Sequence, residues 1–346
     1  MPDFLRWELN AAKPGKPLPP GEFVWSPAMH FLFRRCPRAW FFRHYQAQGG
    51  WNALASDPAM HAYLLKYLVT ADSWMSRAAE DSLTRALQEI MPYSGEGGAQ
   101  ALSEAFKVHV TSQLIRVRDD LERGNYAVDP KRTAFQELYY ATGEFGSVRE
   151  LLSNLRSRFQ DFFSAWDESE LPQELAAMDP LSWRLPPEYR IFPYAGVGVS
   201  LRPWIFSVHR RCVCAWSLRF AFAGREPMNY PDTTSGEEYG LPERVFAAWC
   251  ARKYPDFEVK VRKIFFTPEG LVNRTAVPVP VSEDFVAQSA WPMLREVNRP
   301  GGLKADDFPR LKDQAVCSSC RFRELCTRMP AAEENNVEDQ RKEGLP

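Results

Sequence analysis

The spacing of apolar residues divides the chain into a helical first half and a mixed second half. In the first half, apolar side chains recur every three or four residues, which predicts helices at 26–48, 59–91, 99–124 and 146–168. Ser26 and Pro27 are residue types that favour an N-cap and a first helical position, and Pro37 is expected to split the first helix. Residues 24–185 are therefore predicted to form a large helical region.

The pattern changes near Pro186, where β-branched and aromatic residues become frequent. Residues 188–222 predict three strands, with a turn at Arg210 and Arg211. A helix, a hairpin and a second helix are expected after them, at 236–254, 257–266 with 271–279, and 282–298. These elements place an α/β core at residues 186–300.

Three segments lie outside these two regions. Residues 1–23 are rich in proline and glycine and predict a loop. Residues 301–330 hold a group of cysteines and are expected to bind a metal centre. Residues 331–346 are mostly charged and polar, a composition that predicts disorder.

Composition narrows the functional classes. Hydrophobic residues make up 45% of the chain and the formal net charge is −1, so any contact with nucleic acid requires a local basic patch. No run reaches the ~20 apolar residues of a membrane span, and the N-terminus lacks the apolar stretch of a signal peptide. We therefore expect a cytoplasmic protein without a membrane partner, in which seven reduced cysteines bind metal or are buried.

The last cysteines have the spacing of metal ligands. The sequence CSSCRFRELC is a C-x2-C-x5-C arrangement of Cys317, Cys320 and Cys326. Thiolates suit zinc and iron–sulfur clusters, and both centres usually take four ligands. The candidates for the fourth ligand are Cys36, in the sequence Cys-Pro-Arg at the start of a helix, and three cysteines that read as buried residues, Cys212, Cys214 and Cys250.

The early sequence SP…CPRAWFF together with the late C-x2-C-x5-C resembles the iron–sulfur branch of the PD-(D/E)XK nucleases. That branch includes the AddB nuclease domain and the CRISPR-associated exonucleases, and the resemblance covers roughly residues 24–328. It implies a restriction-endonuclease-like α/β core, a central mixed sheet flanked by helices. It also implies a 4Fe–4S cluster that joins the two chain ends through Cys36, Cys317, Cys320 and Cys326. Zinc is the alternative centre.

The catalytic motifs of this family are degenerate in the chain. The family places a histidine on an early helix, an aspartate on one strand, and an acid and a lysine on the next. The residues at these positions are Glu80, Trp204, Ala215 and Ser217. Glu188 is a possible residual acid before the first of these strands. Because tryptophan, alanine and serine are poor ligands for a hard cation, we expect that Mg²⁺ and Mn²⁺ are not held and that nuclease activity is absent.

Basic residues flank the proposed cluster ligands. They are Arg34, Arg35, Arg38, Arg43, Arg321 and Arg323. Together with Trp40, Phe41, Phe42 and Phe322 they predict a patch that contacts phosphates and stacks on bases. The alternative is a set of solvated helix faces with the aromatic residues turned inward.

These observations leave three functional hypotheses. The first is a silent nuclease-like protein that binds DNA or assembles with a partner, such as a helicase or an active nuclease, in DNA repair, recombination or defence. The second is an active metal-dependent exonuclease whose ligands have moved to other positions. The third is a protein-interaction scaffold with a purely structural metal centre.

Overall fold

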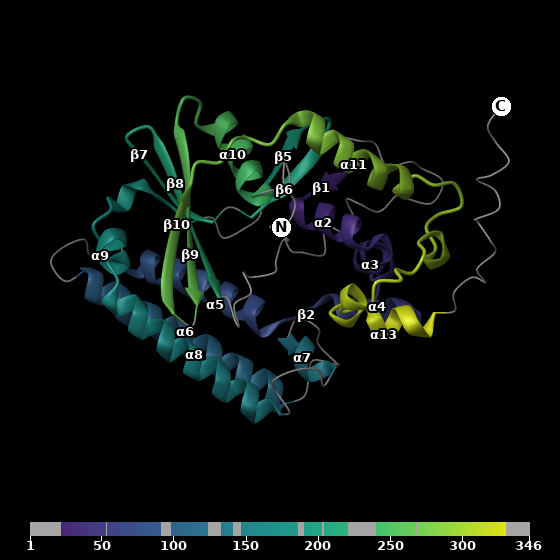
Figure 1. Cartoon of the computed structure of the whole chain (residues 1–346), viewed down its shortest axis with the longest axis horizontal. Coiled ribbons are helices and arrows are strands. Elements are labelled where there is room, and N and C mark those ends of the chain that lie inside the picture. Colours follow the sequence, from purple (N-terminus) through teal and green to yellow (C-terminus); the bar gives the residue numbers. More distant parts are fainter. Residues whose placement is uncertain are drawn as a thin grey trace. The chain divides into compact units, whose positions relative to one another are not determined.

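The computed structural model describes residues 22–52, 54–90, 98–123, 133–140, 147–185, 190–202, 204–220, 240–267 and 269–329 (Figure 1). Backbone contacts divide the chain into two units. The core unit is the continuous segment Tyr67–Ala287. The terminal unit combines Pro2–Lys66 with Gln288–Pro346, so its described residues, 22–52, 54–66 and 288–329, come from the early and late parts of the chain.

The core unit is built on a mixed five-stranded sheet of order β10-β9-β8-β7-β4. Its strands are β4 (Trp183–Arg184), β7 (Ile205–His209), β8 (Cys212–Phe220), β9 (Glu258–Thr267) and β10 (Gly270–Ala276). Strands β8 and β9 run parallel, whereas the other neighbours are antiparallel. A parallel pair needs a crossover connection, and the connection from β8 to β9 includes α10 (Leu241–Lys253).

Helices pack on the sheet and bury its apolar side chains. Three long helices, α5 (Ala71–Ile90), α6 (Gly98–Glu122) and α8 (Val148–Glu168), are followed by the short α9 (Leu171–Ala176) (Figure 1). Their largest core residues, together with those of β8 and β9, are Trp74, Phe106, Phe159, Phe162, Trp166, Trp216, Phe220 and Phe266. This aromatic packing fixes α5 against β8.

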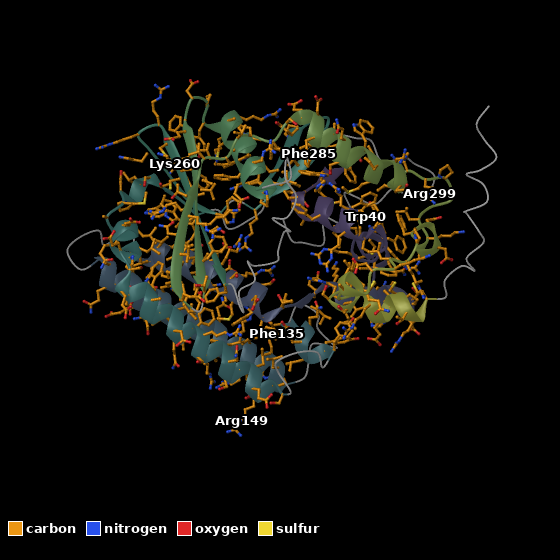
Figure 2. The ribbon with its side chains drawn as sticks, viewed as in Figure 1. Trp40, Phe135, Arg149, Lys260, Phe285 and Arg299 are labelled. Atoms are coloured by element: carbon orange, nitrogen blue, oxygen red, sulfur yellow. The ribbon has the colours of Figure 1, made fainter. Side chains whose placement is uncertain are left out.

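Smaller elements complete the core unit. Strands β5 (Arg190–Tyr194) and β6 (Val197–Leu201) form an antiparallel hairpin. Strand β2 (Leu68–Val69) pairs in parallel with β3 (Ala134–Phe135), which precedes α7 (Gln136–Tyr139). Phe135 is 1% exposed and packs edge-on against Trp74, with ring centroids 5.9 Å apart (Figure 2).

The terminal unit consists of short elements from both ends of the chain. The early ones are β1 (Val24–Trp25), α2 (Pro27–Arg35), α3 (Pro37–Phe41), a π-helical turn (Phe42–Gln46) and α4 (Asp57–Lys66). Helix α11 (Glu283–Val297) begins in the core unit and ends in the terminal unit. A 3-10 turn (Ala305–Asp307), α12 (Gln314–Ser318) and α13 (Arg323–Arg328) follow.

Aromatic side chains join the early and late segments of the terminal unit. Phe41 stacks on Phe308 at 5.4 Å between ring centroids, and Phe42 packs against Phe322 at 5.9 Å. Trp40 is fully buried and touches Phe308 edge-on (Figure 2). These three ring contacts therefore join residues more than 250 positions apart in sequence.

Most predicted elements are present, and the differences have local causes. The helices at 99–124 and 146–168, the helix at 236–254 and the hairpin at 257–279 are confirmed as α6, α8, α10 and β9–β10. The single helix predicted at 59–91 is wrong, because α4 ends at Lys66 and α5 begins at Ala71. Thr70 Oγ1 accepts a hydrogen bond from the backbone N–H of Ser73 at 3.3 Å, so Thr70 starts a new helix.

The second half also differs from expectation. Four strands, β5 to β8, replace the three predicted at 188–222, and the turn at Arg210 and Arg211 is confirmed. The helical region predicted at 24–185 is divided between the two units at Lys66. None of the helices in the described ranges has the length and apolar character needed to cross a membrane.

Candidate functional site

Cys36 lies at the junction of two helices in the terminal unit. It ends α2 and is the N-cap of α3, with extended dihedrals of φ −161° and ψ 100°. Its backbone N–H donates to the carbonyl oxygen of Leu32 at 2.8 Å, and its Sγ accepts from the N–H of Ala39 at 3.4 Å. The helix predicted at 26–48 is therefore interrupted at Cys36, and Pro37 takes the first position of α3.

The late cysteines lie on two short helices and the turn between them. Cys317 is in α12, Cys326 is in α13, and Cys320 is in the connecting turn. The Sγ atom of Cys320 accepts a hydrogen bond from the N–H of Phe322 at 3.4 Å. Hydrogen bonds to sulfur stabilise thiolate ligands and tune a bound cluster.

Arg35 connects the early cysteine to this turn. Its guanidinium donates to Ser319 Oγ at 2.6 Å and to the carbonyl oxygen of Val316 at 3.4 Å. Val316 immediately precedes Cys317 and Ser319 immediately precedes Cys320, while Arg35 itself precedes Cys36. The residue before one candidate ligand thus holds the turn that carries two others.

The four thiols are close enough to affect one another electrostatically. Burial raises the pKa of Cys36, the backbone N–H groups of Ala39 and Arg38 oppose this, and the thiols of Cys326 and Cys317 raise the pKa further. Burial also raises the pKa of Cys320 to about 11, with contributions from Cys36 and Cys326. Such effects decrease with distance, so the early cysteine and the late cysteines are neighbours.

A single metal ion and an iron–sulfur cluster require different spacings of their thiolate ligands. Within the described ranges, no three His, Cys, Asp or Glu side chains are close enough to hold a single metal ion. A lone Zn²⁺ holds four ligands at about 2.0–2.3 Å, whereas a 4Fe–4S cluster spreads four cysteines around a larger body. The N–H···S bonds at Cys36 and Cys320 are of a kind that thiolate ligands accept in either centre.

The other three cysteines lie in the core unit. Cys212 and Cys214 are on β8, and Cys250 is fully buried on α10. Burial raises the pKa of Cys214 to about 11 and that of Cys250 to about 12. Cys250 is buried as expected, whereas Cys212 and Cys214 are half-buried, and all three belong to the unit that does not contain Cys36.

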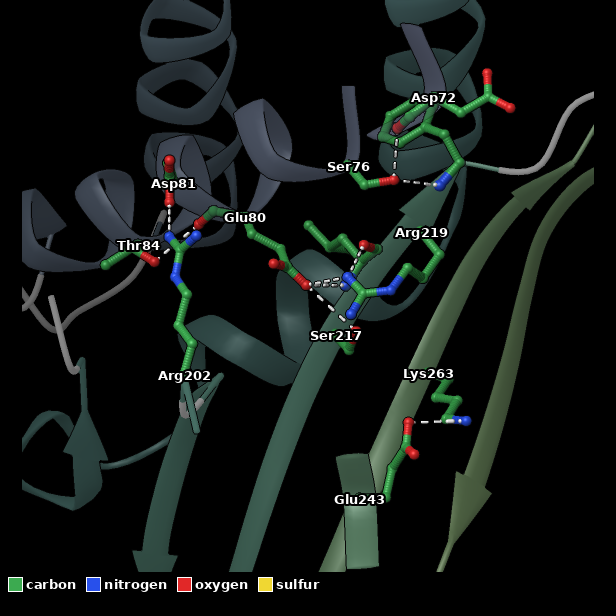
Figure 3. Close-up of polar contacts among 12 residues, drawn as sticks. Asp72, Ser76, Glu80, Asp81, Thr84, Arg202, Ser217, Arg219, Glu243 and Lys263 are labelled. Atoms are coloured by element: carbon green, nitrogen blue, oxygen red, sulfur yellow. Dashed lines mark hydrogen bonds and ion pairs between the residues drawn. The ribbon is translucent and has the colours of Figure 1, made fainter. Parts of the chain in front are cut away.

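In the core unit, the structure brings two of the degenerate motif positions together. Glu80 points from α5 towards β8, where its Oε1 accepts a hydrogen bond from Ser217 Oγ at 3.2 Å (Figure 3). The same oxygen accepts from the N–H of Leu218 at 3.2 Å and from Nη1 of Arg219 at 2.6 Å. One carboxylate oxygen therefore receives three donors, one of them a cation.

Ser76, one turn earlier on α5, explains why Glu80 reaches this position. Its hydroxyl donates to the carbonyl oxygen of Asp72 at 2.9 Å and accepts from the N–H of Phe220 at 3.0 Å (Figure 3). This side chain ties α5 to the end of β8. Position 76 thus carries a hydroxyl that docks the helix on the sheet.

Two of the remaining motif positions hold apolar residues, Ala215 and Trp204, and both lie in apolar surroundings. Ala215 is fully buried and pairs with Phe206 across the β7–β8 ladder. Trp204 packs edge-on against Phe246 of α10, with centroids 5.6 Å apart. Glu188 lies outside the described residues. Neither Ala215 nor Trp204 offers an oxygen ligand for a divalent cation.

Two further ion pairs lie near this site, and neither was expected from the sequence. Lys263 of β9 is in register with Ser217 and pairs with Glu243 of α10 at 2.8 Å (Figure 3). Arg202 pairs with Asp81, the neighbour of Glu80. The sequence hints at these ion pairs only through a glutamate in the largely apolar helix LPERVFAAWC and lysines within a strand pattern.

The basic residues singled out from the sequence have different environments. Arg34 and Arg35 are exposed. Arg43 and Arg321 both donate to the carbonyl oxygen of Lys66, at 3.3 and 3.2 Å, and Arg323 donates to that of Ser318 at 2.6 Å.

Arg38 is only 2% exposed, so the prediction that it contacts nucleic acid is wrong. Trp40, Phe41, Phe42 and Phe322 are buried too, which excludes the predicted base stacking by these rings. The alternative, with the aromatic residues turned inward, is the arrangement found.

Comparison with known proteins does not identify a family for this chain. No family model matches the chain, and no curated protein matches it. One solved structure, the crystal structure of SSO0001, aligns with 72% of this chain and 95% of its own, at 11% identity and a TM-score of 0.29. A likeness at that score carries no argument about function.

Proposed function

We propose that this chain is an iron–sulfur protein with a PD-(D/E)XK nuclease-type core that no longer cleaves DNA, and that it acts as a DNA-binding or assembly subunit. The observation that carries the proposal is the state of Glu80. Its carboxylate is paired with Arg219 at 2.6 Å, although the resemblance to the nucleases would make this residue part of a metal site. The partner we propose is a helicase, an active nuclease or another DNA-processing protein.

The charge arrangement supports the loss of cleavage. A two-carboxylate site for a hard cation needs free oxygen ligands. Glu80 and Glu243 each form an ion pair with a cation, and Ala215 and Trp204 cannot replace them. These ion pairs argue against an active enzyme with relocated ligands.

Incubation with linear DNA tests the loss of cleavage. We expect no degradation of single-stranded or duplex DNA in the presence of Mg²⁺ or Mn²⁺. Degradation that disappears in Glu80→Ala and persists in Asp81→Ala would show that the site is active and would refute the proposal. Asp81 is a suitable control, because it is the next residue and its pair with Arg202 is more exposed.

The proposed cluster has its own test. Protein purified without oxygen should be brown and contain about four irons and four sulfides per chain. Cys36→Ser should lose this iron, whereas Cys212→Ser, a change of a cysteine in the core unit, should keep it. Colourless protein with stoichiometric zinc would show the alternative centre, and protein with neither metal would refute a metal site at these cysteines.

The charge of the terminal unit supports a role in binding DNA. Its described residues include 13 lysines and arginines but only 7 aspartates and glutamates, although the whole chain has a net charge of −1. The exposed cations among them include Arg34, Arg35, Lys304, Arg310 and Lys312. A local excess of this kind attracts phosphates without requiring a basic protein overall.

A gel-shift titration at two salt concentrations tests DNA binding. The double variant Arg34→Glu/Lys312→Glu should weaken binding at least tenfold and flatten its salt dependence. The matched control is Arg149→Glu/Arg156→Glu, which reverses two exposed charges on α8 and should leave binding unchanged. If the wild type binds no DNA but recovers a stoichiometric protein partner, the assembly role stands and the DNA-binding role is refuted.

A further inference from the structure

Arg38 is a buried cation at the start of α3, two residues after Cys36. Its side chain is 2% exposed, and its Nη1 donates to the carbonyl oxygens of Ala305 and Phe308, both at 2.9 Å. The guanidinium carbon lies 5.6 Å from the centre of the Phe42 ring. These contacts join the early and late segments of the terminal unit, but they supply no negative charge.

The rest of the guanidinium has no partner in the described part of the chain. Its Nε and Nη2 are buried and lack a hydrogen-bond acceptor. A buried charge is strongly disfavoured unless an opposite charge compensates it, and removing one partner of a buried pair typically costs several kcal/mol. A fully buried, uncompensated arginine therefore indicates a negative group that the polypeptide itself does not supply.

The four cysteines of the same unit define such a group. A 4Fe–4S cluster held by four thiolates carries net negative charge in both of its usual oxidation states, and more when reduced. The backbone N–H of Arg38 already acts on Cys36, which places the start of α3 beside the proposed centre. The charge and burial of Arg38, two residues after Cys36, are thus those expected of a counter-ion for the cluster.

We infer that the Arg38 guanidinium is the buried counter-charge of the cluster on Cys36, Cys317, Cys320 and Cys326, and that it raises the reduction potential of that cluster. The inference rests on the proposed function, because it needs the cluster. Arg38 is then a tuning residue rather than a ligand. A positive charge favours the reduced form, which is the more negative one, so removing it must make the cluster harder to reduce.

Redox titration of the loaded protein tests this inference. At a fixed potential, Arg38→Met should lower the ratio of reduced to oxidised cluster at least tenfold, which is 59 mV for one electron. Arg38→Lys keeps the charge and should stay within threefold of the wild type. Arg295→Met is the matched control, because Arg295 is an exposed arginine of the same unit, on α11. Its effect should be smaller and should vanish in high salt.

A second measurement covers the case in which Arg38→Met fails to load iron. In the apoprotein the guanidinium has no counter-charge, so apo Arg38→Met should unfold at the same or a higher urea concentration than apo wild type. A clearly lower midpoint would mean that Arg38 acts only through its two carbonyl contacts, and would overturn the inference.

The outcomes separate the two claims. Wild-type protein without iron would refute the proposed function. Loaded wild type and loaded Arg38→Met with the same potential would refute this inference alone.

Discussion

At the residue scale, the most informative feature is the carboxylate of Glu80. Its side chain is 18% exposed and that of Arg219 is 22% exposed, so the pair is largely shielded from water. Such pairs are more strongly coupled than those on the surface, and removing one member leaves the other charge poorly solvated. Glu80 therefore stabilises the contact between α5 and β8.

This predicts that Arg219→Met lowers the free energy of unfolding by about 2–3 kcal/mol, since Glu80 loses its charged donor. The control is Arg202→Met, which breaks the pair with Asp81. Both members of that pair are 36% exposed, so the loss should be about 0–1 kcal/mol. Urea unfolding of both variants measures the difference, and equal losses would contradict the structural role of Glu80.

A second prediction at this scale concerns His30 in the terminal unit. Its Nδ1 lies 2.6 Å from Ser289 Oγ, which also accepts a hydrogen bond from Trp25 Nε1 at 2.8 Å. Burial, and then the charge of Arg34, lower the pKa of His30 from 6.5 to about 4. Between these values the unfolded chain binds more protons than the folded protein, so this contribution to stability is complete above pH 6.5 and decreases towards pH 4.

The loss from this one residue should reach about 3 kcal/mol at pH 4. His30→Gln should flatten the dependence of unfolding free energy on pH across this range. His209→Gln, a change at an exposed histidine ending β7, should not. If unfolding free energy depends on pH in the same way in His30→Gln and in the wild type, His30 is not a buried neutral histidine.

At the element scale, the turn before α4 depends on two glycines with opposite requirements. Gly49 has φ +69° and open space around it, so its conformation matters but its size does not. Gly50 lies so close to α4 that an added Cβ would be 2.3 Å from the carbonyl oxygen of Ala59. Backbone cannot move away as a flexible side chain can, so only glycine fits at position 50.

Gly50→Ala should therefore reduce the stability of the terminal unit by about 1–3 kcal/mol, because it forces α4 away from the turn. Gly49→Asn is the matched change, since asparagine tolerates positive φ, and should cost less than about 1 kcal/mol. Denaturant midpoints of the two variants test this. A Gly50→Ala protein as stable as wild type would mean that α4 is not held against this turn.

At the scale of the whole molecule, the chain ends fold together in a unit separate from the core. The four cysteines belong to the terminal unit, and Phe41, Phe42 and their partners near the C-terminus form its interior. A centre that joins such distant residues closes a loop of nearly the whole chain, and its binding contributes directly to folding. The core unit has its own aromatic interior and needs no such support.

Removing the metal should consequently affect the two units differently. After chelation, amide hydrogen exchange should accelerate at least tenfold in α2, α4 and α13, and remain slow in α5 and α8. Cys36→Ser should reproduce this pattern without chelator, and Cys212→Ser should not. Uniform loss of protection, or none, would contradict a centre that supports the terminal unit alone.

Much of the local structure was predictable because its causes are local. Ser26 accepts a hydrogen bond from the N–H of Met29 at 3.2 Å, as its N-cap position before Pro27 suggested. The apolar spacing of 99–124 and 146–168 predicted α6 and α8. In each case the interacting residues are a few positions apart, so their order in the chain contains the required information.

What the sequence could not decide depends on partners that are far apart in the chain. The motif frame identified Glu80 and Ser217, but only the packing of α5 on β8 showed that Arg219 neutralises Glu80. The pairing of Lys263 with Glu243 requires the parallel register of β8 and β9, and the burial of Arg38 requires the late segment around Phe308. Residue type and spacing thus determined the elements and the candidate ligands. Tertiary structure decided which charges meet and which are buried, because the free energy of a charged group depends on its solvation and on the charges next to it.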